Sequence, residues 1–368
     1  MGDDRNEADF WRGRRVLLTG HTGFKGSWLY LWLRTLGAEV TGYALPPATQ
    51  PCLWDIVGDA NAAGSGAARS LIGDVRDAAA VRAAVERSRP QVLIHMAAQA
   101  LVRESYRDPL GTFATNVQGT ANVLDACRES RDLACAVIVT SDKVYDNDGA
   151  GRPFLEDDRL GGHDPYSGSK ACAELVTNSY RDSYFAGGPP IATVRAGNVI
   201  GGGDWSPDRL IPDCVRALEA GRRVRLRYPD AVRPWQHVLE PLCGYLGTAR
   251  ALVSAPASVP HAINFGPDPE SFCTVAGVVE AFSARFGGRP GWERDGASHP
   301  AEAGALTLSS TLAAHALAWR PVLNIEESLA WTADWYQARA AGRDMRAVSA
   351  AQLAAYRERL GRTPAYGR

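Results

Sequence analysis

A tyrosine and a lysine four residues apart are the side chains best suited to chemistry in this sequence. Tyr166 and Lys170 open an amphipathic segment, so a helix there places both on one face, one turn apart. A lysine ammonium beside a phenol stabilises the phenolate, which lowers the tyrosine pKa from about 10 toward the range of a general base at neutral pH. The same spacing opens ordinary surface helices, so the prediction depends on the surroundings of the pair.

A polar run follows a strongly apolar segment before this pair. Residues 134–140 predict a buried strand, and Ser141, Asp142 and Lys143 come directly after it. In open α/β sheets, ligand chemistry collects at the carboxyl ends of the strands. We therefore predict that these three side chains share an active site with Tyr166 and Lys170.

A glycine pattern near the amino terminus predicts a dinucleotide site. Residues 15–20 form a predicted strand, and residues 27–37 a predicted helix that a glycine closes. Between them, Gly20, Gly23 and Gly26 allow a tight turn, close approach of a pyrophosphate and close packing of helix on strand. A purely structural turn is the alternative, but the flanking strand and helix favour the cofactor. A general base beside a nicotinamide is suited to the oxidation of an alcohol.

The following strands indicate which nucleotide binds. The strand at residues 39–44 ends without the acidic residue that usually holds an adenosine ribose, and no arginine follows closely to hold a 2′-phosphate, so NAD is preferred over NADP. Lys25 is expected to contact the pyrophosphate or ribose, or else to be solvated. Asp74, after a third strand, is expected to bind the adenine amino group, and Ala97, after a fourth, leaves room for a ribose.

Strands and helices alternate from residue 14 to about residue 200, which predicts an α/β fold of Rossmann type with a doubly wound parallel sheet. A smaller, mixed α/β substrate domain is expected to begin in the glycine-rich loop that follows. We expect an NAD-binding domain at residues 10–200, to which 232–260 return, and a second domain at residues 201–231 and 261–360.

Three further segments carry weaker predictions. Arg233, Trp235 and His237 place a bidentate cation, an aromatic ring and an imidazole within five residues, which favours binding of a ligand such as a diphosphate over plain packing. The alanine- and glycine-rich residues 59–68 are expected to form a mobile loop. The loop at residues 299–302, with its histidine and glutamate, is as consistent with substrate contact as with plain surface.

Composition excludes several classes of protein. The 368 residues carry a formal net charge of −1, so nothing indicates a nucleic-acid surface or a basic membrane patch. The polar start of the chain, and the lack of an apolar run of about 18 residues, predict a cytoplasmic protein that is neither exported nor inserted. Seven scattered cysteines with no metal-ligand spacing predict reduced thiols and no metal site.

Several motifs together resemble the CDP-glucose 4,6-dehydratase family, a group of extended short-chain dehydrogenase/reductases in the NAD-dependent epimerase/dehydratase superfamily. The resemblance extends from about Phe10 to about Tyr356, nearly the whole chain. The motifs lie at residues 19–28, 95–99, 140–143, 166–170, 195–205 and 233–242, and those at 20–26 and 233–237 are the most specific.

The resemblance implies a set of binding residues and a homodimer. The dimer is expected to form through two helices near residues 108–128 and 167–184. In the smaller domain, Asn198, Arg209, Arg233 and His237 would hold the nucleotide sugar. The NAD site is predicted to comprise Gly20, Thr22, Gly23, Phe24, Lys25, Gly26, Asp74, Val75, Ala97, Ala98, Gln99, Asn116, Tyr166 and Lys170.

The resemblance also implies a reaction, the dehydration of CDP-glucose to CDP-4-keto-6-deoxyglucose by a hydro-lyase. Tyr166, held by Lys170, would take the proton of the carbon 4 hydroxyl while carbon 4 gives hydride to NAD. Lys143 would take the carbon 5 proton or stabilise the enolate, and Asp142 would protonate the departing carbon 6 hydroxyl. Ser141 would hydrogen-bond the carbonyl oxygen, and the hydride would return to carbon 6.

Alternatives remain open at this point. A nucleotide-sugar 4-epimerase uses the same oxidation but leaves Asp142 and Lys143 idle. A non-catalytic NAD-binding protein tolerates loss of the tyrosine or the lysine, and both are present. Another nucleotide-sugar 4,6-dehydratase is the third alternative, because residues 147–153 depart from the family's aromatic-rich stretch and Ala100 replaces its common proline.

Overall fold

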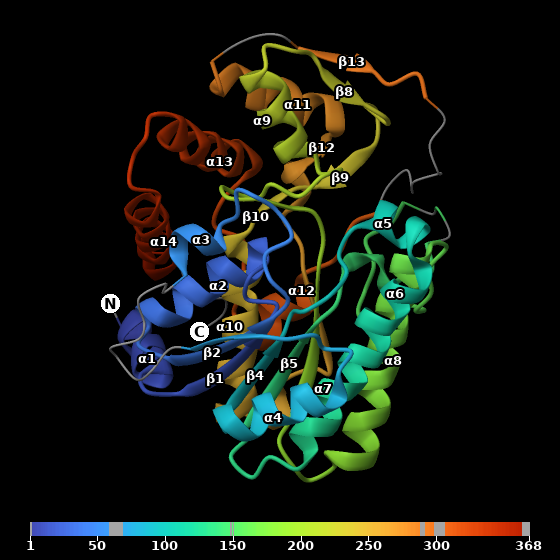
Figure 1. Cartoon of the computed structure of the whole chain (residues 1–368), viewed down its shortest axis with the longest axis vertical. Helices are drawn as coiled ribbons and strands as arrows, with labels where there is room; N and C mark the ends of the chain where they lie inside the picture. Colours follow the sequence, from blue (N-terminus) through green and yellow to red (C-terminus); the bar gives the residue numbers. More distant parts are fainter. Residues whose placement is uncertain are drawn as a thin grey trace.

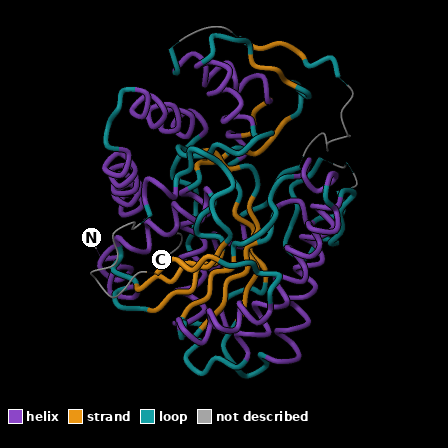
Figure 2. The backbone as a smooth tube through the Cα atoms, viewed as in Figure 1, coloured by secondary structure: helices purple, strands orange, loops and turns teal. Residues whose placement is uncertain are grey.

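In the described part of the chain, the core is one parallel sheet of seven strands, in the order β11-β6-β5-β4-β1-β2-β3. Figures 1 and 2 show this sheet with helices around it. The computed structural model describes residues 2–58, 69–147, 149, 151–287, 291–297 and 306–362. The loops expected at residues 59–68 and around His299 and Glu302 lie outside these ranges. The strands are β1 (Arg15–Thr19), β2 (Glu39–Ala44), β3 (Arg69–Ile72), β4 (Val92–His95), β5 (Cys135–Val139), β6 (Ile191–Ala196) and β11 (Ala262–Phe265).

Helices cover both faces of this sheet, which confirms the doubly wound arrangement. Successive side chains of a strand point to opposite faces of the sheet. In β1, Leu17 packs in one apolar cluster, while Val16 and Leu18 pack in the other. The α2 and α10 helices pack on one face, and α4, α7 and α8 on the opposite face. The bounds are α2 (Phe24–Thr35), α4 (Ala78–Ser88), α7 (Gly119–Arg128), α8 (Pro165–Tyr184) and α10 (Leu239–Ser254).

A smaller group of elements lies above the carboxyl ends of the strands in Figure 1. Its strands pair as β9 with β12, antiparallel, and β8 with β13, parallel. The division into two domains at the expected residues stays a prediction, although β11 is hydrogen-bonded to β6 in the main sheet. The group comprises α9 (Leu210–Glu219), β8 (Val224–Leu226), β9 (Val232–Pro234), β12 (Phe272–Thr274), α11 (Val275–Arg285) and β13 (Trp292–Arg294).

The remaining elements complete the fold around the site. A two-stranded pair forms from β7 (Val199–Ile200) and β10 (Gln236–His237). No helix in the described ranges is both long and apolar enough to cross a bilayer. The other described helices are α1 (Gly2–Trp11), α3 (Trp54–Val57), α5 (Val102–Arg107), α6 (Pro109–Phe113), a π-helix (Ala114–Gln118), three 3-10 turns (Asp142–Val144, Pro256–Ser258 and Pro269–Ser271), α12 (Thr311–Leu317), α13 (Ile325–Ala340) and α14 (Met345–Arg362).

A buried glutamate ties α10 to the carboxyl-terminal helices. Glu240 accepts hydrogen bonds from the backbone N–H groups of Val322 and Leu323, at 3.1 and 2.8 Å, and from the Tyr356 hydroxyl at 2.8 Å. Burial without a cationic partner among these contacts raises the Glu240 pKa to about 8. The folded protein therefore keeps this carboxyl protonated at a pH where the unfolded chain ionises it.

We expect this carboxyl to make the protein less stable as pH rises. Between about pH 4.5 and pH 8 the folded state binds one more proton than the unfolded chain, so the free energy of unfolding falls by roughly 3 to 5 kcal/mol across that range. Glu240→Gln keeps the shape and removes this loss, so urea unfolding should show it more stable than wild type at about pH 8.5 but not at about pH 5. The exposed Glu86→Gln is the control. An unchanged pH slope in Glu240→Gln would contradict the prediction.

Candidate active site

Tyr166 and Lys170 lie in the first turns of α8, with side chains against the carboxyl end of β5. Asp164 caps this helix by accepting from the Ser167 N–H at 3.0 Å, which fixes where the helix starts. Both predicted side chains are buried, with 8% and 5% of their surface exposed. The Lys170 ammonium donates to the Val139 carbonyl at 3.2 Å.

The Tyr166 phenol differs from the expected phenolate. Burial raises the pKa of Tyr166 to about 12, and the effect of the Ser141 hydroxyl, which lowers this pKa, only partly offsets it. The expectation of a lowered pKa is therefore wrong for this arrangement, because desolvation exceeds the effect of the donors around the phenol. Burial also lowers the Lys170 pKa to about 8, against the opposing effect of the Glu174 carboxylate.

Of the three residues after β5, Ser141 and Asp142 lie near Tyr166, and Lys143 lies near Asp142. Ser141 caps a 3-10 turn by accepting from the Lys143 N–H at 3.2 Å, and its hydroxyl donates to Asp142 Oδ1 at 3.0 Å. Lys143 Nζ lies 3.9 Å from the same carboxylate oxygen. Asp142 is buried, while 28% of the Lys143 side chain is exposed. A carboxyl, an ammonium and a phenol therefore meet at the end of one strand.

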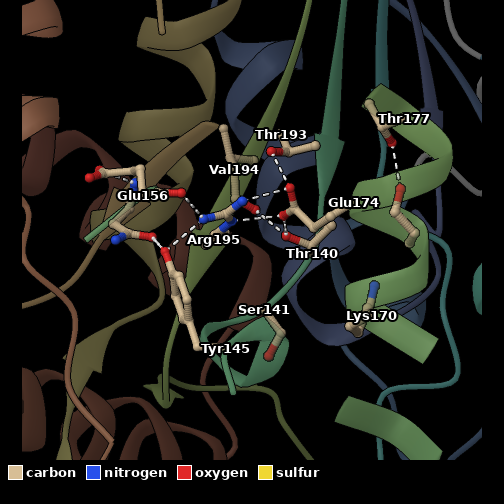
Figure 3. Close-up of polar contacts among 12 residues, drawn as sticks. Thr140, Ser141, Tyr145, Glu156, Lys170, Glu174, Thr177, Thr193, Val194 and Arg195 are labelled. Carbon is tan, nitrogen blue, oxygen red and sulfur yellow. Dashed lines mark hydrogen bonds and ion pairs between the residues drawn. The ribbon is translucent and has the colours of Figure 1, made fainter. Parts of the chain in front are cut away.

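A buried ion pair that the sequence reasoning missed supports this arrangement (Figure 3). Arg195 of β6 binds Glu174 of α8 through two bonds of 2.9 Å, and both side chains are almost fully buried. Thr140 and Thr193 donate to the two carboxylate oxygens of Glu174. Glu174 follows Lys170 by four residues, so an acidic residue on the buried face of the same helix was the available signal.

The network continues from the ion pair into the loop after the 3-10 turn. Arg195 also donates to the Tyr145 hydroxyl at 2.7 Å and to the Glu156 carbonyl at 2.9 Å. Tyr145 in turn donates to Asn264 Oδ1, at 2.7 Å, on β11. Residues on both sides of the altered 147–153 stretch are thus held to the same arginine.

The glycine loop fits a dinucleotide phosphate. Gly20 has a φ of +77°, and a Cβ there would lie 2.8 Å from the Ala97 nitrogen. A Cβ on Gly26 would meet the Gly20 carbonyl oxygen, so only glycine permits this packing of helix on strand. The amino terminus of α2 follows Gly23 with no side-chain cap and no acidic residue in its first turn, which leaves N–H groups for an anion.

Lys25 points toward the catalytic residues. Its ammonium donates to the Tyr245 hydroxyl of α10 at 2.8 Å. Burial is the main cause that lowers the pKa of Lys25 to about 7. The nearby cations Arg209 and Lys170 lower this pKa further, and Asp142 raises it. The partly buried hydrogen bond to Tyr245 disfavours the alternative of an ordinary solvated lysine, and contact with the cofactor stays a prediction.

The loop after β4 is held by Asn116. Its side chain accepts from the Gln99 N–H at 2.8 Å and donates to Ser169 Oγ at 2.9 Å, which ties this loop to α8. Asn116 lies in a π-helix, an irregularity that is frequent at functional sites. The Ala97 N–H donates to Thr19 Oγ1 at 3.1 Å, and Ala98 lies next in this loop.

The other predicted cofactor residues surround the ends of β1 to β3. Thr22 donates to the Leu45 carbonyl at 2.8 Å. Asp74 accepts hydrogen bonds from Arg76, which lower the Asp74 pKa. Contact of Asp74 with adenine remains a prediction. Phe24 begins α2, and Val75 is buried.

The predicted substrate residues occupy different environments. Arg209, at the start of α9, pairs with Asp204 at 3.1 Å and also influences the Tyr166 pKa, so it lies near the catalytic residues. Arg233 is buried and donates to the Val232 carbonyl. The Asn198 carbonyl accepts from the backbone of β10.

His237 is fully buried with its ring edge-on to Trp331. Burial lowers the His237 pKa to about 3, so its imidazole is neutral. Its Nε2 has no hydrogen-bond partner in the described part of the chain. Trp235, its predicted companion, is also buried and donates to the Cys273 carbonyl. These contacts favour packing for both rings, and a sugar contact of His237 stays a prediction.

The parallel sheet and the uncapped helix after the glycine loop define a dinucleotide-binding protein of the Rossmann class. A model of the NAD dependent epimerase/dehydratase family matches residues 16–251, and the chain belongs to this family. The family confirms NAD as the expected cofactor.

Within this family, the similarity to nucleotide-sugar dehydratases is extensive. The chain is 43% identical over 356 residues to the CDP-glucose 4,6-dehydratase of Salmonella typhimurium, covering 95% of this chain and 98% of that protein. It is 30% identical to the dTDP-glucose 4,6-dehydratase of Streptomyces griseus, covering 87% and 93%. The structure of Thermus thermophilus UDP-glucose 4-epimerase with NAD matches with a TM-score of 0.74 at 27% identity, covering 88% and 99%. The predicted resemblance and fold class are confirmed.

Proposed function

We propose that the protein is an NAD-dependent hydro-lyase that converts CDP-glucose to CDP-4-keto-6-deoxyglucose. The observation that carries the proposal is the meeting of Tyr166, Asp142 and Lys143 at the end of β5, because elimination needs an acid and a base beyond the oxidising tyrosine. The 43% identity to a CDP-glucose 4,6-dehydratase over nearly the full length supports the choice of reaction and nucleotide.

NAD, when bound, would supply the hydride acceptor for carbon 4 and the hydride donor for carbon 6. Gly20, Gly23 and the α2 amino terminus would hold its pyrophosphate. Tyr166 would take the proton of the carbon 4 hydroxyl. Lys170 would orient the cofactor beside it.

The elimination step falls to the residues after β5. Lys143 would remove the carbon 5 proton, which the ketone at carbon 4 acidifies, or stabilise the enolate. Asp142 would give a proton to the departing carbon 6 hydroxyl, so that water leaves. Ser141 donates to Asp142 in this structure, so its expected role as a donor to the carbonyl oxygen would require the hydroxyl to turn.

A 4-epimerase is the second candidate, because solved epimerases share the fold. Epimerisation needs oxidation at carbon 4 and a turn of the sugar, but no acid for carbon 6. The Asp142–Lys143 contact is therefore the observation that favours dehydration.

We also propose a cytoplasmic homodimer. Exposed apolar side chains gather on the expected helices, with Leu110 and Phe113 on α6 and Leu175 and Tyr184 on α8, from 38% to 81% exposed. Burial of such a surface against a second copy is favourable.

We further propose that Arg209 and Arg233 hold the diphosphate of the nucleotide sugar.

The test is incubation of the purified protein and NAD with CDP-, UDP-, GDP- or dTDP-glucose, read by mass spectrometry. We expect the loss of one water from CDP-glucose, and a strongly reduced rate in Lys143→Ala. Lys143 is partly exposed, so we expect Lys143→Ala to keep the fold, which circular dichroism checks. A product of unchanged mass that is an isomer of the substrate would contradict dehydration and favour the 4-epimerase.

A further inference from the structure

The Tyr145 hydroxyl is held between two strands of the main sheet. It donates to Asn264 Oδ1 of β11 at 2.7 Å and accepts from the Arg195 guanidinium of β6, also at 2.7 Å (Figure 3). All three side chains are buried. The Tyr145 ring stacks on Phe154, with the ring centroids 4.7 Å apart and the planes 6° from parallel. Because the hydroxyl both donates and accepts and the ring is stacked, this side chain is held in one position.

This tyrosine directly follows the turn that carries Asp142 and Lys143. The 3-10 turn is three residues long and lies between the end of β5 and Tyr145. At its second end, the Val144 carbonyl accepts from the Gly161 N–H at 2.8 Å. A 3-10 turn has poorer hydrogen-bond geometry than an α-helix, so its position depends on what holds its ends. The Tyr145 hydroxyl therefore anchors the second end of this turn to β6 and β11.

The chain after β6 limits the place of the Asp142 carboxylate from another direction. Gly197 comes directly after β6, two residues beyond Arg195. A Cβ on Gly197 would lie 3.0 Å from Asp142 Oδ2 and 3.4 Å from Pro234 Cγ. The φ of Gly197 lies outside the left-handed region, so the backbone alone does not require glycine here. The missing side chain instead leaves room for the carboxylate, so one short segment of β6 contacts both ends of the turn.

The two halves of the proposed reaction use groups from different elements. This inference rests on the proposed function, in which Tyr166 of α8 acts at carbon 4 and the turn after β5 acts at carbons 5 and 6. In the elimination, carbon 5 gives a proton to Lys143, the C–O bond at carbon 6 breaks, and the departing oxygen takes a proton from Asp142. A double bond between carbons 5 and 6 and one water result. A shift of the turn therefore affects elimination, whereas oxidation depends on α8.

We propose that Tyr145 and Gly197 are positioning residues for the elimination step. The Tyr145 hydroxyl fixes the turn that carries the acid and the base, and Gly197 leaves the space that the acid occupies. A misplacement of about 1 Å between reacting groups can cost about 10²-fold in rate. Removal of the Tyr145 hydroxyl leaves the two 2.9 Å bonds between Arg195 and Glu174, so α8 keeps its attachment to the sheet.

Tyr145→Phe tests this assignment, because it removes the hydroxyl and keeps the stacked ring. Oxidation is measured alone with NAD and CDP-6-deoxyglucose, which has no hydroxyl on carbon 6 to eliminate, by stopped-flow absorbance of reduced nicotinamide. We expect its rate to stay within about threefold of wild type. With CDP-glucose, water release read by mass spectrometry should be slower by about 10- to 10²-fold, and reduced nicotinamide should accumulate during turnover.

Gly197→Ala tests the same inference from the other side of the turn. The added methyl group must displace the Asp142 carboxylate or Pro234, while the Tyr145 hydroxyl keeps its partners. We expect the same division, with oxidation of CDP-6-deoxyglucose close to wild type and water release from CDP-glucose slower by about 3- to 30-fold. Urea unfolding checks that each variant is folded, and either folded variant can show or refute the division.

A control separates positioning from a loss of stability. Tyr356→Phe removes an equally buried hydroxyl, which donates to Glu240 at 2.8 Å, and should leave both rates close to those of wild type. A variant of Tyr145 or Gly197 that slows oxidation and water release alike, or slows neither, would overturn the role of that residue, while water release by wild type upholds the dehydratase. Failure of wild type to release water from any nucleotide sugar would overturn both proposals.

Discussion

Tyr166→Phe is expected to lower the turnover of the nucleotide sugar by about 10²- to 10⁴-fold while NAD binding changes little. The substitution removes one oxygen from a buried ring, so the packing of α8 against β5 persists. The proton of the carbon 4 hydroxyl then has no acceptor, and the ketone on which elimination depends does not form. The loss should fall on kcat more than on KM, because the phenol acts in the transition state.

Steady-state water release and calorimetric NAD titration provide the measurement. Tyr180→Phe is the matched control, since it removes a hydroxyl from a partly buried tyrosine on the same helix. Retention of more than about a tenth of wild-type kcat in Tyr166→Phe would show that another group takes the proton, which contradicts the assignment of the base.

Arg195→Met is expected to cause the largest loss of stability, about 3 to 5 kcal/mol in the free energy of unfolding. It leaves the Glu174 carboxylate buried with only the two threonine hydroxyls as partners. Urea unfolding at neutral pH measures the loss. Neutralising both partners in Glu174→Gln/Arg195→Met should recover much of it, because no unpaired charge then remains.

The strength of the buried Arg195–Glu174 pair can be compared with that of an exposed pair. A loss below about 1 kcal/mol in Arg195→Met would mean that the ion pair contributes no more than an exposed one. The exposed ion pair between Arg225 and Glu293 offers the comparison, and Arg225→Met should cost little. Activity should fall further than stability explains in Arg195→Met, because the same arginine holds Tyr145 in the chain segment after Lys143.

The sheet was predictable because its strands are short apolar runs followed by glycine, polar or small residues. The bounds of β2 at residues 39–44 agree with the prediction, and β1 differs by one residue. The α1 and α14 helices were not predicted, since their sequences are polar or alanine-rich and give no clear apolar stripe. The place of β11 beside β6 also escaped prediction, because strand order depends on packing between segments distant in sequence.

In the candidate site, too, some residues could be predicted from local patterns and other features depend on the tertiary fold. Local patterns found Tyr166, Lys170 and the three residues after β5, because motif and strand end lie close in sequence. The spacing of Glu174 from Lys170 marked a buried acidic residue, but its partner Arg195 lies on a strand distant in sequence and could not be predicted from local patterns. The direction of the Tyr166 pKa also could not be predicted, because it depends on how much solvent the fold removes.

The place of β11 has a consequence for biosynthesis. Strand β6 ends at Ala196, and its outer neighbour β11 begins only at Ala262, after α9 and α10. A nascent chain that has emerged from the ribosome only as far as α10 therefore presents the hydrogen-bonding edge of β6 without a partner. An unprotected edge can pair with another chain, so incomplete products that stop between these strands are the ones expected to aggregate and to need chaperones.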